Sequence, residues 1–323
     1  MREKTVVRLL VLLAGAGLVA VAVAAASAPV PVKATTRNEN TPSASAEYLA
    51  WSKSRRGKPT TFDVYAQPTG GAPFKVNAPG TVGWAGGIDG TRLAYQQVWK
   101  KNSDIRFFDL LARRRSSPSG VNTKRWEWRA TISGDWLLFG RGRIFNRALQ
   151  QVILRNLVTH EQRVLDSIHN KNGMLQAGQV NGNFAVWMKC NPSPSCSVYR
   201  YDITARTTTP MPSSGKVQYG PSVTPIGTTY YGRSGPSCGA SAELVKTTID
   251  GATEVLYTLP AGKDFFSSFA LAVPSKPPPP PVTITRVYFD LATCHPDRED
   301  IYSLDDGTRL PPSPPPGAQP ARP

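Results

Sequence analysis

The chain has 323 residues, 40% of them hydrophobic, and a formal net charge of +16 at neutral pH. This length is sufficient for one large core or two ordinary ones, and the positive charge favours polyanionic partners or surfaces. Only three histidines are present and none forms a pair at helical spacing, which excludes the common two-histidine metal motif.

The first 28 residues predict export. Arg2, Lys4 and Arg8 precede an uncharged apolar run from Leu9 to Ala26, and small residues follow it. A basic start, an apolar middle and a small-residue end are typical of a cleaved signal peptide. The run is also long enough to cross a bilayer as a helix, so an uncleaved N-terminal anchor stays the alternative. In both cases the rest of the chain lies outside the cytoplasm, secreted or in the cell envelope, and it touches a membrane only through an uncleaved N-terminal segment.

A repeated unit organises residues 46–310. Asp89-Gly90-Thr91 is a tight turn ahead of an alternating apolar run, and related turns recur at Gly134, Gly182 and Gly227. These glycines are 44, 48 and 45 residues apart, within the range of about 40–50 residues that is typical of four-stranded propeller blades. The sequence therefore predicts an all-β fold, a six-bladed β-propeller of four-stranded antiparallel blades, which we expect to be a monomer.

The blades are expected at about 48–76, 82–117, 126–166, 175–211, 219–259 and 265–310. In blade one the inner strand is placed at 48–51, and in blade six a turn at Asp306-Gly307 leads into a fourth strand at 309–310. Residues 29–45 before the propeller are rich in Pro, Thr, Ser and Ala, and are expected to form a linker or a first edge strand. Residues 311–323 after it are expected to form a proline-rich disordered tail.

The segment Asp89-Gly90-Thr91-Arg92-Leu93-Ala94-Tyr95 resembles the Asp-Gly-x-x-[Ile/Leu]-[Ala/Val]-[Phe/Tyr] signature of TolB-like propeller repeats, which belong to WD-repeat-like exported proteins. Blades three and four keep the turn and the apolar pattern without the Asp-Gly order, and blade five keeps Gly227 and its tyrosines. The resemblance covers about residues 46–310. It implies a six-bladed propeller and, more weakly, a binding platform or a scaffold in an envelope assembly, because propellers host unrelated functions.

The four cysteines predict two disulfides, because an even number of cysteines in an exported chain is typical of bridges. Cys190 and Cys196 lie in one loop between consecutive strands of blade four. Cys238 and Cys294 lie in the corresponding loops of the neighbouring blades five and six. We therefore predict the pairs Cys190–Cys196 and Cys238–Cys294, with free thiols or a metal site as the alternatives.

No catalytic residue, metal site or cofactor is predicted. Gly235-Pro236-Ser237-Cys238-Gly239 matches the G-x-S-x-G nucleophile elbow of hydrolases, but it joins two strands, whereas that elbow requires a strand, a sharp turn and a helix. His160 is expected in a solvated turn, and His295 is expected near the centre of one end of the ring. No general base stands out among these residues.

Cations gather in the loops expected at one end of the ring. In an up-and-down blade, the loops between second and third strands and the connections between blades share one end, and the other loops share the opposite end. The opposite end carries most of the acidic turns, together with Arg113-Arg114-Arg115. The first end holds, with almost no acids, the candidate ligand-binding residues Arg55, Arg56, Lys58, Lys100, Lys101, Arg141, Arg143, Arg147, Lys189 and Arg233.

These patterns favour an exported, non-catalytic propeller that acts as an interaction platform and binds an anionic polymer or an envelope protein through its basic end. The alternative is a propeller lyase or hydrolase that acts on an acidic polysaccharide and draws its base from lysine, arginine, tyrosine or His295 near the channel. Titratable groups that converge in the channel mouth would favour the enzyme.

Overall fold

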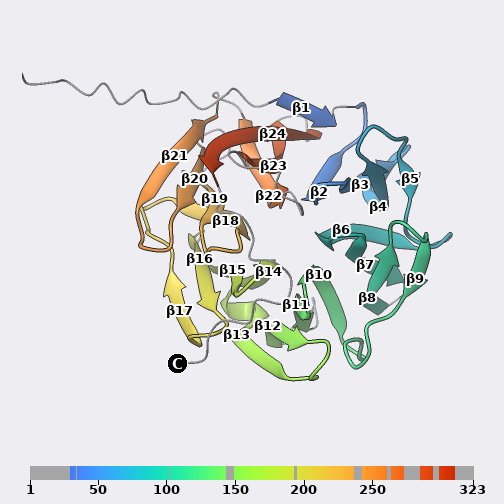
Figure 1. Ribbon diagram of the computed structural model, residues 1–323, viewed down its shortest axis with the longest axis horizontal. Coiled ribbons are helices and arrows are strands. Elements are labelled where there is room, and N and C mark those ends of the chain that lie inside the picture. The colour runs from blue at the N-terminus through green and yellow to red at the C-terminus, as the bar shows by residue number, and fades with distance from the viewer. Residues whose placement is uncertain are drawn as a thin grey trace, which may run out of the picture.

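The computed structural model describes residues 30–33, 35–100, 102–142, 149–192, 195–235, 242–259, 263–272, 284–293 and 298–309. Its strands form six four-stranded antiparallel sheets arranged around a central axis (Figure 1). The predicted all-β, six-bladed propeller is therefore confirmed. Within the described ranges, no helix has the length and apolarity needed to cross a membrane.

In blades one to five the four strands follow chain order from the channel to the rim. The strands of blades one and two are β2 (Glu39–Ala44), β3 (Tyr48–Arg55), β4 (Lys58–Pro68), β5 (Phe74–Lys75), β6 (Val82–Asp89), β7 (Arg92–Trp99), β8 (Asn102–Asp109) and β9 (Arg114–Ser116). Those of blades three and four are β10 (Trp126–Ser133), β11 (Trp136–Gly142), β12 (Leu149–Asn156), β13 (Gln162–His169), β14 (Met174–Asn181), β15 (Phe184–Asn191), β16 (Ser195–Asp202) and β17 (Thr207–Pro210). Those of blades five and six are β18 (Val217–Val223), β19 (Thr229–Ser234), β20 (Glu243–Thr247), β21 (Thr253–Thr258), β22 (Lys263–Ala272), β23 (Ile284–Thr293), β24 (Arg298–Arg309) and β1 (Val30–Lys33).

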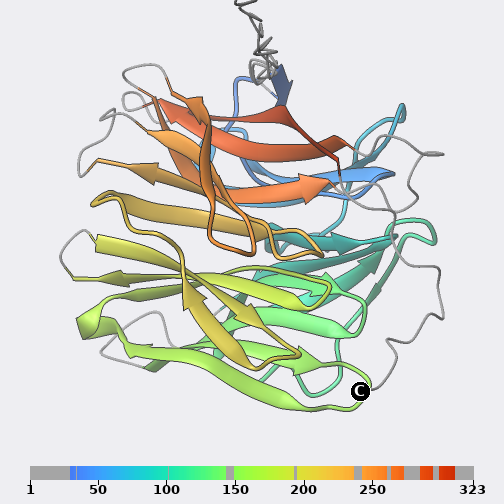
Figure 2. The same ribbon diagram turned by 60° about the vertical axis from the view of Figure 1, so that its left-hand side comes forward.

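The N-terminal strand closes the ring. β1 pairs antiparallel with β24, with Val30 opposite Ser303 and Lys33 opposite Ile301, and the two strands lie side by side in Figures 1 and 2. Blade six therefore takes its outer strand from the segment that precedes blade one. The predicted turn at Asp306-Gly307 and the fourth strand at 309–310 are wrong, because β24 continues to Arg309 and β1 occupies its outer edge.

The inner strand of blade one was also misplaced. It is β2, inside the segment predicted as a linker or a first edge strand, and the 48–51 run belongs to the second strand β3. The sequence of β2, ENTPSA, has no large apolar side chain to mark a strand, yet all six residues are buried because they line the crowded centre of the ring. The propeller therefore begins at residue 30 instead of 46.

The glycine turns of blades two to four have the predicted geometry. Gly90, Gly134 and Gly182 each begin a two-residue loop between the first two strands of a blade, with φ between 55° and 57°, a region that glycine adopts without strain. Gly227 in blade five differs, because it has a φ of 84° and lies in the longer loop between Val223 and Thr229. The flanking pairs are Asp89 with Arg92, Ser133 with Trp136, and Asn181 with Phe184.

A second repeated turn, which was not recognised in the sequence, joins the third and fourth strands of blades two to four. An Asp or Asn side chain at its start accepts hydrogen bonds from the backbone N–H groups two and three residues ahead, at 2.8–3.0 Å. The residue four positions ahead has a positive φ. The turns start at Asp109, Asn156 and Asp202, and the positive-φ residues are Arg113, His160 and Arg206.

Apolar side chains pack in layers between neighbouring blades. Leu93 and Tyr95 of blade two, for example, lie in one buried cluster with Ala50 and Val64 of blade one, and similar clusters join the following blades. Blades six and one are joined by hydrogen bonds between polar groups. Asn40 Nδ2 donates to Glu299 Oε2 at 2.5 Å, and the backbone N–H of Thr41 donates to Asp290 Oδ2 at 3.2 Å.

The disulfide Cys190–Cys196 is present, as predicted, and joins directly opposite positions of the β15–β16 hairpin. Cys238 and Cys294 lie outside the described residues, so their pairing stays a prediction.

A chain that starts at Thr35 should be less stable than one that starts at Pro29, because it lacks β1. The strand pairs with β24 at three positions, and a backbone hydrogen bond is worth about 1 kcal/mol net. We expect the free energy of unfolding in urea to fall by about 2–3 kcal/mol. Equal stability of the two chains would show that the ring does not depend on β1 for closure.

Replacing both Cys190 and Cys196 by Ser should reduce the free energy of unfolding by about 2 kcal/mol, since the bridge closes a loop with a sequence separation of 6. Urea denaturation of the oxidised protein and the variant measures this difference. Non-reducing peptide mapping of the same oxidised protein tests the other pair, and free Cys238 and Cys294 thiols would contradict the second bridge.

Candidate functional site

The topology places the seven described cations of the predicted set at one end of the ring. They lie in or beside the loops β3–β4, β7–β8, β11–β12, β15–β16 and β19–β20, which all connect the second and third strands of a blade. We call this end, with the connections between blades that share it, the basic end. Of the ten predicted residues, Lys101, Arg143 and Arg147 lie outside the described residues.

Four of the seven predicted cations that the structure describes form ion pairs within the protein. Arg141 is only 9% exposed, so it does not lie on the open surface that we expected. The partners were missed because they lie on adjacent strands and not in the loops themselves. The pairs are Arg55–Asp63 at 2.7 Å, Arg141–Glu127 at 3.0 Å, Lys189–Asp166 at 2.9 Å and Arg233–Glu243 at 2.6 Å.

Other cations at the basic end are exposed. Arg56, Lys58 and Lys100 have no ion pair within the described part of the chain, and the connections between blades add Lys124 and Arg125, with Lys171 in the short 3-10 turn Asn170–Asn172. The acids at the basic end, in contrast, are paired. In blades one to five, the described acids at this end all lie in ion pairs: Glu39, Asp63, Asp104, Glu127, Asp166 and Glu243. The uncompensated positive charge is therefore carried by exposed side chains of blades one to four.

A groove open to solvent lies at the basic end, beside blade one. It contains about 770 Å³ of space and is formed by residues 36–38, which lead into β2, and residues 54–59 of the β3–β4 hairpin. Its lining includes four cations and no acid: Arg37, Arg55, Arg56 and Lys58. Such a lining suits an anionic group.

A second cavity lies in the channel, where the inner strands are irregular. The pairing register shifts within every inner strand, from β2 to β22, which indicates a β-bulge in each blade. Five of these strands line one cavity. Neighbouring strands come very close here, because a Cβ atom on Gly86 would lie 2.0 Å from the carbonyl oxygen of Ala130.

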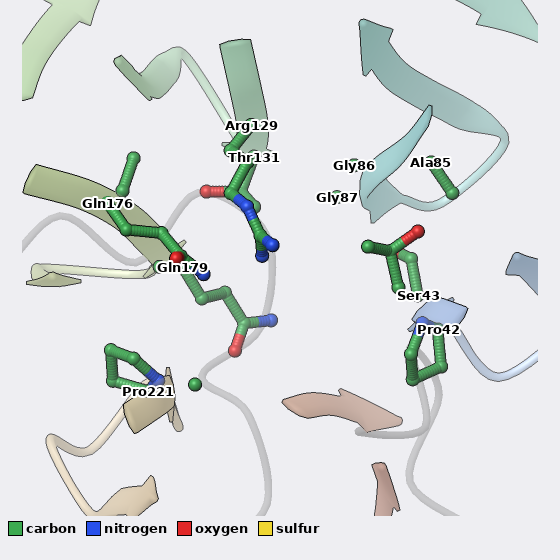
Figure 3. Close-up of a pocket in the computed structure, with 14 residues that line it drawn as sticks. Pro42, Ser43, Ala85, Gly86, Gly87, Arg129, Thr131, Gln176, Gln179 and Pro221 are labelled. Atoms are coloured by element: carbon green, nitrogen blue, oxygen red, sulfur yellow. The ribbon is translucent and has the colours of Figure 1, made fainter. Parts of the chain in front are cut away.

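Arg129 is the charged residue of this channel cavity, among the described residues that line it. Figure 3 shows its guanidinium directed into the cavity, near the side-chain amides of Gln176 and Gln179. Burial lowers the pKa of Arg129, whereas the charges of Asp290 and Glu299 act to raise it. The guanidinium nevertheless stays protonated, because its ordinary pKa is far above neutrality.

The buried ion pairs of the basic end perturb their carboxyl groups in opposite directions. Burial acts to raise the pKa of Asp63, but hydrogen bonds from Arg55, Lys75 and Asn77 outweigh it and the pKa is lowered. Glu127 is fully buried, and there the burial dominates, so that its pKa is raised in spite of its contacts with Thr123 and Arg141. Glu243 behaves like Asp63: burial opposes the hydrogen bonds from Lys216 and Arg233, and its pKa is lowered.

The G-x-S-x-G match from Pro236 onward and His295 lie outside the described residues. Across the described ranges, no three or more His, Cys, Asp or Glu side chains are grouped so that they could hold a metal ion.

The structure thus defines a six-bladed propeller with a basic end and a polar channel cavity. No protein-family model and no curated protein sequence matches the chain. Its fold is similar to that of TolB: a protein described as TolB from Agrobacterium tumefaciens superposes with a TM-score of 0.52 and 13% identity, over 70% of this chain and 83% of that one.

Propeller enzymes share the fold to the same degree. A luciferin-regenerating enzyme has a TM-score of 0.53 and 9% identity, over 86% of this chain and 95% of that one. An oligogalacturonate lyase in complex with manganese has a TM-score of 0.51 and 10% identity, over 83% of this chain and 89% of that one. At these sequence identities the similarity establishes the fold alone, and the function has to be inferred from the chemistry of the sites.

Asp63→Asn and Glu243→Gln should each lower the free energy of unfolding at neutral pH by about 1 kcal/mol or less, because cations paired with these acids, such as Arg55 and Lys216, are partly exposed and the pairs are screened by solvent. A carboxyl group whose pKa is lowered by folding stabilises the protein above its unfolded pKa, and this contribution disappears as the pH falls through the folded pKa. The wild type should therefore lose stability below about pH 4, and the variants should lose less over the same window.

Urea unfolding between about pH 2 and 7 measures these slopes. Glu47→Gln is the control, since Glu47 is exposed and has no ion pair among the described contacts. Identical acid slopes in all three variants would mean that the two ion-paired carboxyl groups do not contribute.

Proposed function

We propose that the protein is an exported, non-catalytic propeller that binds an anionic polymer through its basic end. The observation that carries this proposal is the separation of charges at that end. Its acids in blades one to five are held in ion pairs, while exposed cations from four successive blades have no ion pair among the described residues. The fields of these cations add and attract a polyanion from a distance.

A polymer suits this surface better than a small anion. The exposed cations lie in two hairpins, β3–β4 and β7–β8, and in the connections that lead into blades three and four. A single small anion contacts only one of these loops, whereas an extended chain contacts several and gains from each. The groove at blade one, with Arg37, Arg56 and Lys58, offers one such contact.

The export part of the proposal rests on residues 1–28 and is supported by the position of β1. This strand begins at Val30, directly after the proposed signal. As the outer strand of blade six, β1 runs toward the connection with β2 at the basic end, so Val30 lies at the opposite end. If the N-terminal segment stayed uncleaved as an anchor, the basic end would face away from the membrane.

The alternative function, a lyase or hydrolase that acts on an acidic polysaccharide, requires a base in the channel. The acids whose charges act on Arg129 are Asp290 and Glu299, and neither lines the described cavity. Both are buried and accept hydrogen bonds from Thr41 and Asn40. This arrangement gives them a role in the junction between blades six and one, which favours binding over catalysis.

Reversing two charges in the groove, Arg56→Glu with Lys58→Glu, should weaken binding to heparin or another polyanion by about tenfold or more at low salt. The remaining affinity should also depend less on salt, because fewer counterions are released. Heparin affinity chromatography and fluorescence titration across a salt series measure both effects, and thermal unfolding verifies the fold.

The matched control is Arg114→Glu with Arg206→Glu, which changes the net charge equally at the opposite end, where both side chains are exposed. This variant should retain most of the affinity. If both pairs of substitutions weaken binding equally, net charge alone explains the affinity and the proposed basic end has no dedicated role.

A further inference from the structure

We propose that a groove between blades six and one is a docking site for the proline-rich segment at residues 311–323 of the same chain. The groove lies at the end of the ring opposite to the basic end, so the proposal does not depend on polymer binding. It rests on the chemistry of the groove lining and on the strand from which the proline-rich segment continues.

The groove crosses the junction that β1 closes. Its lining comes from β1, from the β2–β3 and β4–β5 turns of blade one, and from β23 and β24 of blade six. The two turns lie at the opposite end, because they join the first to the second and the third to the fourth strand of their blade. The groove is open to solvent and has a volume of about 480 Å³, within the range of about 300–1,000 Å³ that is typical of ligand sites.

Two tyrosines give the groove aromatic rings and hydroxyl donors. Tyr48 comes from blade one and Tyr288 from blade six, and both side chains are partly exposed. The Tyr48 hydroxyl makes no hydrogen bond within the described part of the chain. Tyr288 accepts a hydrogen bond from Arg286, since a guanidinium has only donors, and its own proton has no acceptor among the described residues.

The charged groups of the lining, in contrast, have partners within the protein. Lys33 donates to Gln67 Oε1 and lies over the ring of Trp51, with 4.7 Å between its Nζ and the ring centroid. Arg286 forms a bidentate pair with Asp305, at 2.6 and 3.0 Å. The groove therefore suits an uncharged ligand with apolar rings and carbonyl acceptors, and proline has both and lacks an N–H group.

The chain supplies such a ligand next to the groove. Asp305 of β24 lines the groove, and β24 ends at Arg309, at the same end of the ring. The segment that starts two residues later reads Pro-Pro-Ser-Pro-Pro-Pro over residues 311–316, which lie outside the described residues. A sequence of this kind favours the polyproline II helix, whose carbonyl groups are not used internally, and aromatic-lined grooves bind it. Because the segment is tethered, its local concentration is on the order of millimolar, so a weak intrinsic affinity is sufficient.

Fluorescence anisotropy with a labelled peptide of residues 311–323 tests the proposal on the full-length protein. The wild type should bind this peptide weakly, because its own segment occupies the groove. Replacing Pro314, Pro315 and Pro316 by Ser in the protein should free the groove, and this tail variant should bind the peptide about tenfold more tightly. A peptide with the same three replacements is the control and should not bind.

Removing the two hydroxyl groups tests the location of the site. Tyr48→Phe with Tyr288→Phe, added to the tail variant, retains both rings and should weaken peptide binding by about tenfold or more, because two hydrogen bonds are lost. The matched control is Tyr199→Phe, a tyrosine stacked on Trp187 in blade four, which should leave the affinity unchanged. Thermal unfolding verifies the fold of each variant.

Three results would overturn the proposal: equal binding of the peptide to the wild type and the tail variant, no binding to the tail variant at about 1 mM peptide, or equal loss in the two-tyrosine variant and its control. Analytical ultracentrifugation tests whether the segment of a second copy binds instead. A wild-type dimer that the tail variant does not form would contradict docking within one chain. The tail variant should retain the heparin affinity of the wild type, so that failure of the polymer proposal and failure of this one are distinguishable.

Discussion

Closure of the ring by β1 is the constraint on which the rest of the structure depends. Each blade buries its apolar face only against the next blade, so an open ring leaves two faces and a strand edge exposed. β1 completes blade six from the other end of the chain, and Asn40 and Thr41 join β2 to Glu299 and Asp290 through hydrogen bonds. Both candidate sites then follow, because the channel and the two ends exist only in the closed ring.

The closed ring also explains why some cations of the basic end are paired with acids while others are exposed to solvent. Strand ends at the basic end bring oppositely charged residues of adjacent strands together, as in Arg141 with Glu127 and Arg233 with Glu243. Burial of these pairs requires that each charge be matched. Loop tips have no such neighbours, so Arg56, Lys58 and Lys100 remain exposed to solvent and available to a ligand.

The structure of the channel is determined by the close approach of the inner strands. Six inner strands meet around one axis, and the bulges and glycines relieve the contact between their backbones, as at Gly86 beside Ala130. The same bulges interrupt the regular pairing and leave space between the strands. In blade three this space receives the guanidinium of Arg129, which joins the polar side chains of Gln176 and Gln179 in the lining of the channel.

Local sequence determined the blades, because the features that define them are local: alternating apolar runs, and two-residue turns with a glycine such as Gly90 or Gly134. The short bridge Cys190–Cys196 could be predicted for the same reason, since both cysteines lie in one hairpin. Contacts between distant segments could not be predicted from the local sequence. The pairing of β1 with β24, the burial of β2 despite its polar residues, and the ion pairs of Arg55 and Arg141 depend on strands that meet only when the ring closes. Arg129 likewise carries no signal in its own segment, because its surroundings in the channel come from the inner strands of four other blades, and only the tertiary structure brings them together.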